Sequence, residues 1–457
     1  MVADKSTFGL GMVTLDRRVG SLRLQLADQL RAAIRDGRLE TGVRLPSTRR
    51  LAVQLGVSRG VATDVYAVLA AEGWIAPTRN ARPIVRSVAP LDSPAHAKAS
   101  WRFDLTPNAP DLISFPRTAW LAATRRALAS AIPAELGYGD PAGPLRARVT
   151  LAGYLGRSRA AAVSAEQIVV TSGYTQALAL ICRALAAQGV RSIAVEDPSL
   201  DDAWGTIRQA GLEIVAVGVD EQGIDTRALA ALDVAAVLVT PAHQYPTGVR
   251  LSPARRRALV QWAQTRSALI IEDDYDGEHV DPHAGVGVLQ ALAPDRIVLI
   301  GSASKTLAPA LRIGWLHAPA ALASAIERER WFADSGPPAL TTLAFAEFIE
   351  RGDLGKHLRR SRTANRSRRD ALIAALAETR LGPAAGQVIA GPHLCIELPT
   401  HVDDRTVTDR LATQRINVRA LSTYRLAHPG PPGLVLGYSQ IHEDSALLVA
   451  RMIATAI

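Results

Sequence analysis

The first regular pattern in the chain is a run of apolar residues at helical spacing, formed by Leu22, Leu26, Leu30, Ala33 and Ile34. Residues three or four positions apart share one face of a helix, so this run predicts a helix with one buried side. Ser47 and Ser58 are good caps for two further helices, over 47–55 and 59–71. With two short strands behind them, these elements predict a winged helix-turn-helix over residues 15–86.

Beyond about residue 165 the pattern changes to short apolar runs that alternate with helical patterns. The apolar runs with the length of strands are 168–171, 192–195, 213–217, 235–240, 268–272 and 296–300. Helices are predicted between them over 174–187, 201–210 and 253–265. This alternation predicts an α/β fold with a mainly parallel sheet covered on both faces, whose ligands bind at the carboxyl ends of the strands.

Residues 87–112 connect the two modules and follow neither pattern. They are rich in Pro, Ser and Ala, which is typical of a semi-flexible linker. The large module is therefore predicted to cover 113–457 of a 457-residue chain that is too long for one ordinary domain. A linker of this kind would let the two modules reorient.

Charge separates the two modules as well. Residues 1–86 carry 14 Lys and Arg against 7 Asp and Glu, whereas the whole chain has 52 against 43. Most of the formal net charge of +9 therefore lies in the small module. A basic module joined to a nearly neutral one indicates a polyanionic partner for the basic part alone.

Composition also narrows the compartment. No stretch of about 18 uncharged apolar residues is present, and the first residues lack the pattern of an export signal. Cys182 and Cys395 lie far apart without a CxxC motif, and the histidines lack metal-ligand spacing. We therefore expect a cytoplasmic protein with no disulfide framework, no metal site and no membrane contact.

In a winged helix-turn-helix the third helix enters the major groove with its amino end toward the bases. Arg49 and Arg59 are forked donors that can reach guanine edges or phosphates, and Ser58 with its neighbouring amides can hold a phosphate. The DNA backbone would be bound by three more arginines, namely Arg44, Arg79 and Arg82.

Three short sequence motifs of the small module match a known family: Arg44-Leu-Pro-Ser-Thr-Arg49, Leu55-Gly-Val-Ser-Arg59 and Leu69-Ala-Ala-Glu-Gly-Trp74. They resemble the amino-terminal domain of GntR-superfamily regulators, which implies a double-stranded DNA operator as partner. The resemblance implies DNA contacts at Arg49, Ser58, Arg59 and Gly60. It carries over less well to the wing, where Asn80-Ala-Arg82 stands in place of the usual glycines.

Chemistry-bearing residues follow the predicted strands of the large module. Ser172, Gly173 and Thr175 open a helix after 168–171, where amides and hydroxyls can bind a phosphate. Asp273 and Tyr275 place a carboxylate and a phenol two residues apart at the end of the next-to-last run.

The last run leads into Gly301-Ser-Ala-Ser-Lys305, which Arg312 follows seven residues later. A lysine with a lowered pKa can hold an aldehyde as a Schiff base, and the arginine can hold a phosphate beside it. These are the needs of pyridoxal 5'-phosphate (PLP): Asp273 would keep the ring nitrogen protonated, and Tyr275 would donate to the ring oxygen.

The large module also contains several sequence motifs that match a known family: Tyr138-Gly-Asp-Pro-Ala-Gly143, Val195-Glu-Asp-Pro198, Thr240-Pro-Ala-His-Gln-Tyr-Pro-Thr-Gly248, Ile271-Glu-Asp-Asp-Tyr-Asp276 and Gly301-Ser-Ala-Ser-Lys-Thr-Leu-Ala-Pro-Ala-Leu-Arg312. With the small module, they resemble the MocR subgroup of GntR regulators. The resemblance implies a fold-type-I, aspartate-aminotransferase-like domain with a smaller C-terminal α+β subdomain. It implies PLP on Lys305, ring contacts from Asp273 and Tyr275, phosphate contacts from Ser302, Ser304 and Arg312, and a homodimer in which Tyr138 comes from the partner subunit.

Two positions depart from the family pattern. Leu200 stands where an aromatic residue commonly lies against the cofactor ring, so stacking is lost. Val435 stands where α-amino-acid aminotransferases place the arginine that binds the substrate carboxylate. Efficient transamination of common amino acids is therefore doubtful.

Two features remain open between a local and a functional reading. His243 can bond to its neighbours or act as a base. The basic run 359–369 can be a second DNA contact or, as its helical spacing favours, a solvated helix whose arginine stems pack on a neighbour.

We therefore expect a DNA-binding transcription regulator that carries PLP and senses PLP itself or an amine or amino-acid effector. Two alternatives remain. One is a working aminotransferase with an appended DNA-binding head, which Val435 disfavours. The other is a PLP-free dimerisation scaffold, which Lys305, Asp273 and the phosphate cluster disfavour.

Overall fold

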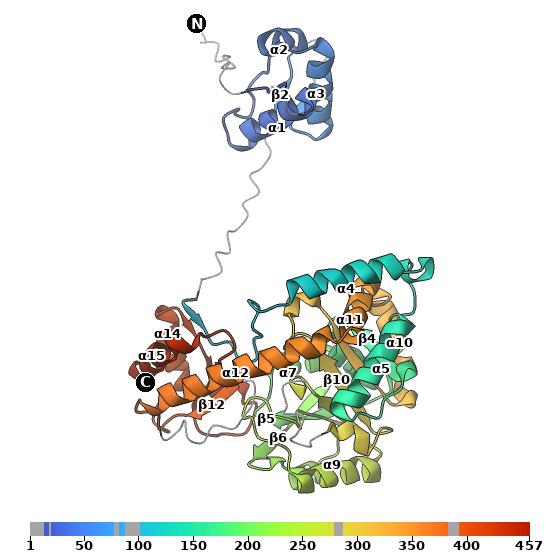
Figure 1. Ribbon diagram of the computed structural model, residues 1–457, viewed down its shortest axis with the longest axis vertical. Coiled ribbons are helices and arrows are strands. Elements are labelled where there is room, and N and C mark those ends of the chain that lie inside the picture. The colour runs from blue at the N-terminus through green and yellow to red at the C-terminus, as the bar shows by residue number, and fades with distance from the viewer. Residues whose placement is uncertain (1–12, 18–19, 77–81, 87–100, 278–286, 383–392) are drawn as a thin grey trace. The chain divides into compact units, whose positions relative to one another are not determined.

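The computed structural model describes residues 13–17, 20–76, 82–86, 101–277, 287–382 and 393–457. The chain divides into two compact units between Lys98 and Ala99, drawn in Figure 1. In the described part of the chain, no helix is long and apolar enough to cross a membrane.

The first unit is the predicted winged helix-turn-helix. Its elements are α1 (Leu22–Arg35), α2 (Thr48–Leu55), α3 (Arg59–Ala71) and an antiparallel hairpin of β1 (Ile75–Ala76) and β2 (Ile84–Val85). Ser47 and Ser58 cap α2 and α3, because their hydroxyls accept the amides of Arg50 and Val61, both at 3.3 Å. Gly56 ends α2 at φ +64°, in the left-handed region that favours glycine.

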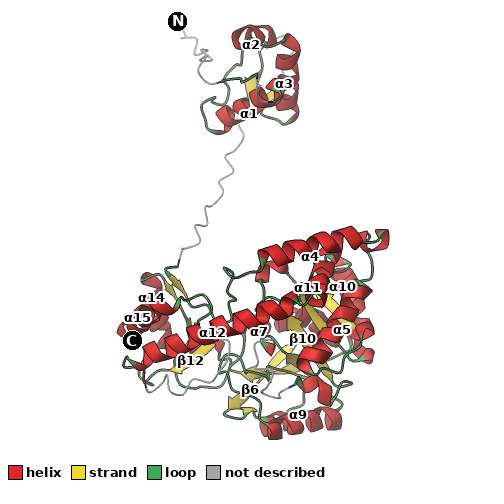
Figure 2. Ribbon diagram, viewed as in Figure 1, coloured by secondary structure: helices red, strands yellow, loops and turns green. Residues whose placement is uncertain are grey.

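The second unit is built on an eight-stranded sheet (Figure 2). Across the sheet the order is β4 (Ile168–Thr171), β11 (Gly314–His317), β10 (Ile297–Ser302), β9 (Leu269–Asp273), β8 (Ala236–Val239), β5 (Ser192–Asp197), β6 (Glu213–Asp220) and β7 (Gly223–Ile224). The pairs from β10 to β6 are parallel, while β11 and β7 run against their neighbours. The prediction of a mainly parallel sheet is confirmed.

Helices bury both faces of this sheet. On one face, Ile271 packs in a core with α6 (Tyr174–Ala187), α7 (Asp201–Gln209) and α10 (Ala320–Asp334). On the other, Ile270 packs with α8 (Thr226–Ala230) and α9 (Pro253–Arg266). Adjacent residues of a strand point to opposite faces, which explains why the strands read as continuous apolar runs. A further layer consists of α4 (Arg117–Ser130), α5 (Leu145–Arg159) and α11 (Ala339–Glu350).

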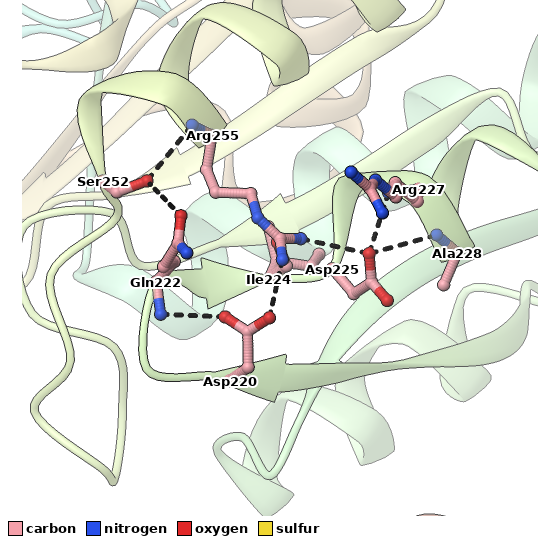
Figure 3. Close-up of polar contacts among 8 residues, drawn as sticks. All are labelled: Asp220, Gln222, Ile224, Asp225, Arg227, Ala228, Ser252 and Arg255. Carbon is pink, nitrogen blue, oxygen red and sulfur yellow. Dashed lines mark hydrogen bonds and ion pairs between the residues drawn. The ribbon is translucent and has the colours of Figure 1, made fainter.

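Arg255 fastens α9 to the edge of the sheet, as Figure 3 shows. Its guanidinium bonds to Asp220 at 2.6 Å, to the carbonyl of Ile224 at 2.8 Å and to Asp225 at 3.1 Å. Ser252 caps the same helix by accepting the amide of Arg255 at 3.3 Å. These contacts stabilise the β6–β7 edge and take no part in the cavity described below.

A smaller subdomain follows the sheet. Its three antiparallel strands, in the order β12 (His393–Glu397), β15 (Gly433–Gly437) and β14 (Arg419–Ala420), pack against α12 (Asp353–Ala377), α14 (Asp404–Thr413) and α15 (Ala446–Ala456). The short 3-10 helices of the unit are η1 (Pro133–Leu136), η2 (Ala165–Gln167), η5 (Leu289–Leu292), η6 (Pro309–Leu311), η7 (Leu421–Tyr424) and η8 (Glu443–Ser445).

The predicted linker, 87–112, overlaps this unit at its carboxyl end. Here β3 (Phe103–Asp104) pairs in parallel with β13 (Ile416–Asn417), and Leu105 is fully buried in the core of the subdomain. The backbone of Thr106 passes so close to Gly437 that an added Cβ there would lie 2.1 Å from its carbonyl oxygen. The segment lacks a repeating pattern because its partners are distant in sequence. Residues 87–100 lie outside the described part.

Candidate functional site

A cavity of about 330 Å³ lies at the carboxyl ends of the central strands. Strands β5, β8, β9 and β10, the first turns of α6 and α7, and the subdomain residues Arg419 and Tyr424 all contribute to its wall. This is the place that the topology of an open parallel sheet predicts.

Most of the predicted cofactor residues line this cavity: Thr175, Asp273, Tyr275, Ser302, Ser304, Lys305 and Arg312. Ser172 and Gly173 are not part of its lining, and the amide of Ser172 donates to the side chain of Gln176 at 2.7 Å. Gly173, at φ +115°, lies beneath Arg312, whose guanidinium would be 3.6 Å from an added Cβ. Tyr138 is 87% exposed and does not line the cavity of its own chain.

Lys305 contributes its side-chain amine to the lining of the cavity. Burial lowers its pKa, and the carboxylates of Asp273 and Asp202 oppose that shift. A lowered pKa leaves more of the amine uncharged near neutral pH, which is the form that attacks a carbonyl.

Asp273 faces the cavity, whereas the nearby carboxylates of Asp274 and Asp276 bond to the side chains of Arg159 and His243. Burial raises the pKa of Asp273 well above its ordinary value, and the charges of Asp274 and Asp276 add to the shift. Asp274 forms a two-pronged ion pair with Arg159, both bonds at 2.8 Å. Asp276 bonds to Nδ1 of His243. Asp273 instead faces the cavity, where Lys305 opposes the rise of its pKa and a further cationic group would stabilise its charged form.

His243 has a local role in this structure. Its Nε2 accepts a hydrogen bond from Nε of Arg250 at 3.2 Å, so Nδ1 carries the proton and donates to Asp276. Because both ring nitrogens are occupied and the residue does not line the cavity, the reading of His243 as a base has no support here.

Tyr275 presents a buried hydroxyl that lacks a hydrogen-bond partner among the described residues. Its ring lies edge-on to Tyr245 with centroids 5.9 Å apart. A buried polar group is normally bonded, so an orphan hydroxyl on a cavity wall indicates a ligand oxygen. The phenolic oxygen of PLP fits this position.

The other end of the cavity suits a phosphate. Ser302 and Ser304 lie with their hydroxyl oxygens 2.9 Å apart, and Thr175 lies in the first turn of α6. Arg312 is held at φ +51°, which is costly for a residue other than glycine. Hydroxyls, a guanidinium and a helix amino terminus together form an anion site. The residues present therefore fit PLP at both ends.

Several lining residues were missed by sequence reasoning. The hydroxyls of Tyr245 and Tyr424 lie 2.9 Å apart although 179 residues separate them. Glu196 accepts hydrogen bonds from the hydroxyl and the amide of Thr240, at 2.6 and 3.0 Å. Arg419 comes from β14, a two-residue strand without a recognisable pattern. Glu196 and Tyr245 could have been found, because both lie in motifs that the chain shares with the family.

The structure describes both residues that depart from the family pattern, Leu200 and Val435. Leu200 lines the cavity, so an aliphatic side chain replaces the usual aromatic one. Val435 is fully buried among Tyr245, Tyr275 and Tyr424, and it offers no charge to a carboxylate.

In the first unit, the predicted DNA contacts are exposed: Arg44, Arg49, Ser58, Arg59 and Gly60. Arg49 lies in the first turn of α2, and Ser58, Arg59 and Gly60 lie at the start of α3, whereas Arg44 forms a bridge with Ile84 of β2. Arg79 lies outside the described residues, as does most of the wing tip. In the second unit the basic run lies on α12, where Arg359 and Arg360 are exposed and Arg368 pairs with Asp111 at 2.9 Å. Among the described residues, no cluster of His, Cys, Asp and Glu could hold a metal ion.

Comparison with known families and folds agrees with this geometry. Residues 103–434 match the family of class I and II aminotransferases, and residues 22–81 match the gntR family of bacterial regulatory proteins. The chain resembles an archaeal alanine:glyoxylate aminotransferase, with a TM-score of 0.70 and 24% identity over 77% of this chain and 90% of that one. The aspartate aminotransferase of Thermus thermophilus with maleate gives a TM-score of 0.68 and 21% identity over 79% and 93%. These structures show the fold.

Curated relatives cover both units. The pyridoxine biosynthesis transcriptional regulator PdxR of Corynebacterium glutamicum is 35% identical over 448 residues, which is 96% of each chain. The probable rhizopine catabolism regulatory protein MocR of Rhizobium meliloti is 28% identical over 94% of this chain and 92% of its own. The chain therefore belongs to the GntR-family transcription regulators of the MocR and PdxR type, in which a helix-turn-helix domain is followed by a class I and II aminotransferase domain.

Proposed function

We propose that this regulator binds a double-stranded DNA operator through its first unit and PLP through its second, with PLP held as a Schiff base on Lys305. The observation that carries the proposal is the cavity itself. It combines a buried lysine of lowered pKa, the buried carboxyl group of Asp273 and a phenol whose hydroxyl lacks a hydrogen-bond partner among the described residues, all beside an anion site.

Each group has a proposed role. Asp273 would hold the ring nitrogen and Tyr275 the ring oxygen, while the phosphate would bind Ser302, Ser304, Arg312 and the start of α6. PLP supplies an aldehyde that takes up amines and a ring that withdraws electrons. In the homodimer that we propose, Tyr138 would complete the site of the partner subunit, consistent with its exposure. On DNA, contacts are assigned to Arg44, Arg49, Ser58, Arg59, Gly60 and Arg79.

The signal would be PLP or an amine that reacts with it. The name of the Corynebacterium glutamicum relative refers to pyridoxine biosynthesis, which supports PLP as part of the signal. Binding would change operator affinity only if PLP or the amine favours one of two arrangements of the protein. A regulator of this kind would act in the cytoplasm, where the DNA lies.

The test combines a spectrum with an operator titration. We expect the purified full-length protein to acquire a near-visible absorption band with PLP, and Lys305→Ala to lose it. Borohydride reduction followed by peptide mapping should place the label on Lys305. Operator affinity, measured by fluorescence anisotropy, should change with PLP in the wild type alone.

A matched control is Lys356→Ala, because Lys356 is exposed on α12 and does not line the cavity. No band under saturating PLP would contradict the cofactor assignment. A band without any change in operator affinity would contradict the sensing role. Turnover of an amino donor with a keto-acid acceptor would favour a working aminotransferase instead.

A further inference from the structure

The strand register places a cation beside the position where the carboxylate-binding arginine is missing. In the antiparallel pair of β14 and β15, Arg419 lies directly opposite Val435. Residues opposite each other in such a pair project from the same face of the sheet, with Cβ atoms about 5 Å apart. A long arginine side chain on the neighbouring strand can therefore reach the space that an arginine at position 435 would serve.

The surroundings of Arg419 show that it does reach the cavity. It lines the same wall as Lys305 and hydrogen-bonds the hydroxyl of Tyr424, which lies 2.9 Å from the hydroxyl of Tyr245. Its charge opposes the burial that raises the pKa of both phenols. A guanidinium carries five N–H donors, so a bond to one phenol leaves donors for a forked contact with a carboxylate.

The remaining charges limit what such a ligand can carry. Of the described cations that line the cavity, Lys305 would be used by PLP and Arg312 by its phosphate, which leaves Arg419. Asp201 and Asp202 line the same cavity at the first turn of α7. One carboxylate is matched by Arg419, whereas a second would meet these acids.

We propose that Arg419 binds the carboxylate of an amine effector, so that the cavity selects amines with a single carboxylate. This inference rests on the proposed PLP site at Lys305. Arg419 would determine which amines bind, because it supplies from the adjacent strand the guanidinium that position 435 lacks. Amines without a carboxylate bind less tightly, and so do dicarboxylates.

The test uses stable PLP–amine adducts, which need no reaction in the site. The probes are N-(5'-phosphopyridoxyl)-L-alanine and N-(5'-phosphopyridoxyl)ethylamine, which differ only in that the second has a hydrogen atom in place of the α-carboxylate. Calorimetry on the full-length apoprotein measures their dissociation constants. We expect the alanine adduct to bind about 10- to 100-fold more tightly, the range for a hydrogen bond to a charged group. The glutamate adduct should bind more weakly than the alanine adduct.

Variants assign this preference to Arg419. Arg419→Gln should weaken the alanine adduct to the level of the ethylamine adduct while leaving the latter unchanged. Arg419→Lys should recover part of the preference, because it keeps the charge but loses the fork. Arg451→Gln, which changes an exposed residue of α15, is the control and should preserve the full preference.

The outcomes separate this inference from the proposed function. If both adducts bind the wild type equally, or if Arg419→Gln weakens them equally, the role of Arg419 is wrong while the PLP site stands. If neither adduct binds the wild type, the PLP site is wrong and this inference falls with it.

Discussion

Burial is the first cause of the unusual protonation of single residues around the cavity. It raises the pKa of Glu196 to about 7, although hydrogen bonds from Thr240 and Gln244 oppose the shift. It raises the pKa of Glu272 to about 7 as well, against bonds from the amides of Leu289 and Gln290. Both carboxyls are therefore expected to change their charge near neutral pH.

Glu196 makes stability depend on pH. Its pKa is higher in the folded state than its ordinary 4.5, so folding favours the protonated form. The unfolding free energy should fall as pH rises from about 4.5 to about 7 and then level off. Glu196→Gln should remove its part of this slope, at most about 1.4 kcal/mol per pH unit. Urea unfolding of the apoprotein at pH 5, 6 and 7 measures the difference.

Glu213→Gln, at an exposed position of β6, is the matched control and should leave the slope unchanged. An identical slope in Glu196→Gln and the wild type would show that Glu196 is ionised in the folded protein throughout this range.

At the scale of elements, the two serine caps of the first unit have the same local geometry. Ser47 starts α2 and Ser58 starts α3, each accepting an amide three residues later at 3.3 Å. Only Ser58 is assigned a DNA contact, because α3 would enter the major groove. Its hydroxyl can accept the helix amide and still donate its proton to a phosphate.

This pair gives a controlled experiment on DNA binding. Ser47→Ala and Ser58→Ala should each destabilise the first unit by about 1 kcal/mol, the typical loss for a helix cap. Ser58→Ala should also weaken operator binding several-fold beyond Ser47→Ala, because it loses a phosphate contact. Thermal unfolding and anisotropy titrations, made well below the unfolding temperature, separate the two effects. Equal losses of affinity would place Ser58 outside the interface.

For the whole molecule, the second unit presents apolar side chains that a monomer would leave in water. Those more than half exposed on α4, η1, α5 and the turn between them are Leu121, Leu128, Ile132, Leu136, Tyr138, Leu145 and Val149. Large exposed apolar surfaces mark interaction sites, and homodimers use the same surface on both subunits. We expect the proposed dimer to bury this surface.

Ile132→Glu should therefore shift the protein toward monomer, because a charge would be buried in the interface. Sedimentation velocity across a concentration series measures the shift. Leu448→Glu is the control, since Leu448 is partly exposed on α15, at the other end of the unit from α4 in Figure 1. An unchanged dimer in Ile132→Glu would contradict the assignment of this surface.

Features that depend on short stretches of chain could be predicted from the sequence alone. The helix predicted over 174–187 is α6 with the same bounds, and β4 matches the run 168–171. Helical spacing, strand length and serine caps are local properties, so they can be read without knowing the partners. The motifs at the strand ends also predicted that Asp273, Tyr275, Lys305 and Arg312 lie close together, because parallel strands end at the same edge of a sheet. All four residues line one cavity.

Contacts between residues that are distant in the chain became known only from the fold. The pairing of β3 with β13 draws residues of the predicted linker into the subdomain, and the contact of Tyr245 with Tyr424 crosses from the sheet to that subdomain. Arg419 lies opposite Val435 because of a strand register that no local pattern encodes. Burial sets the pKa of Asp273 and Glu196, and burial depends on everything that packs around a group. Such contacts come from long-range pairing, which leaves no periodic signal in the chain.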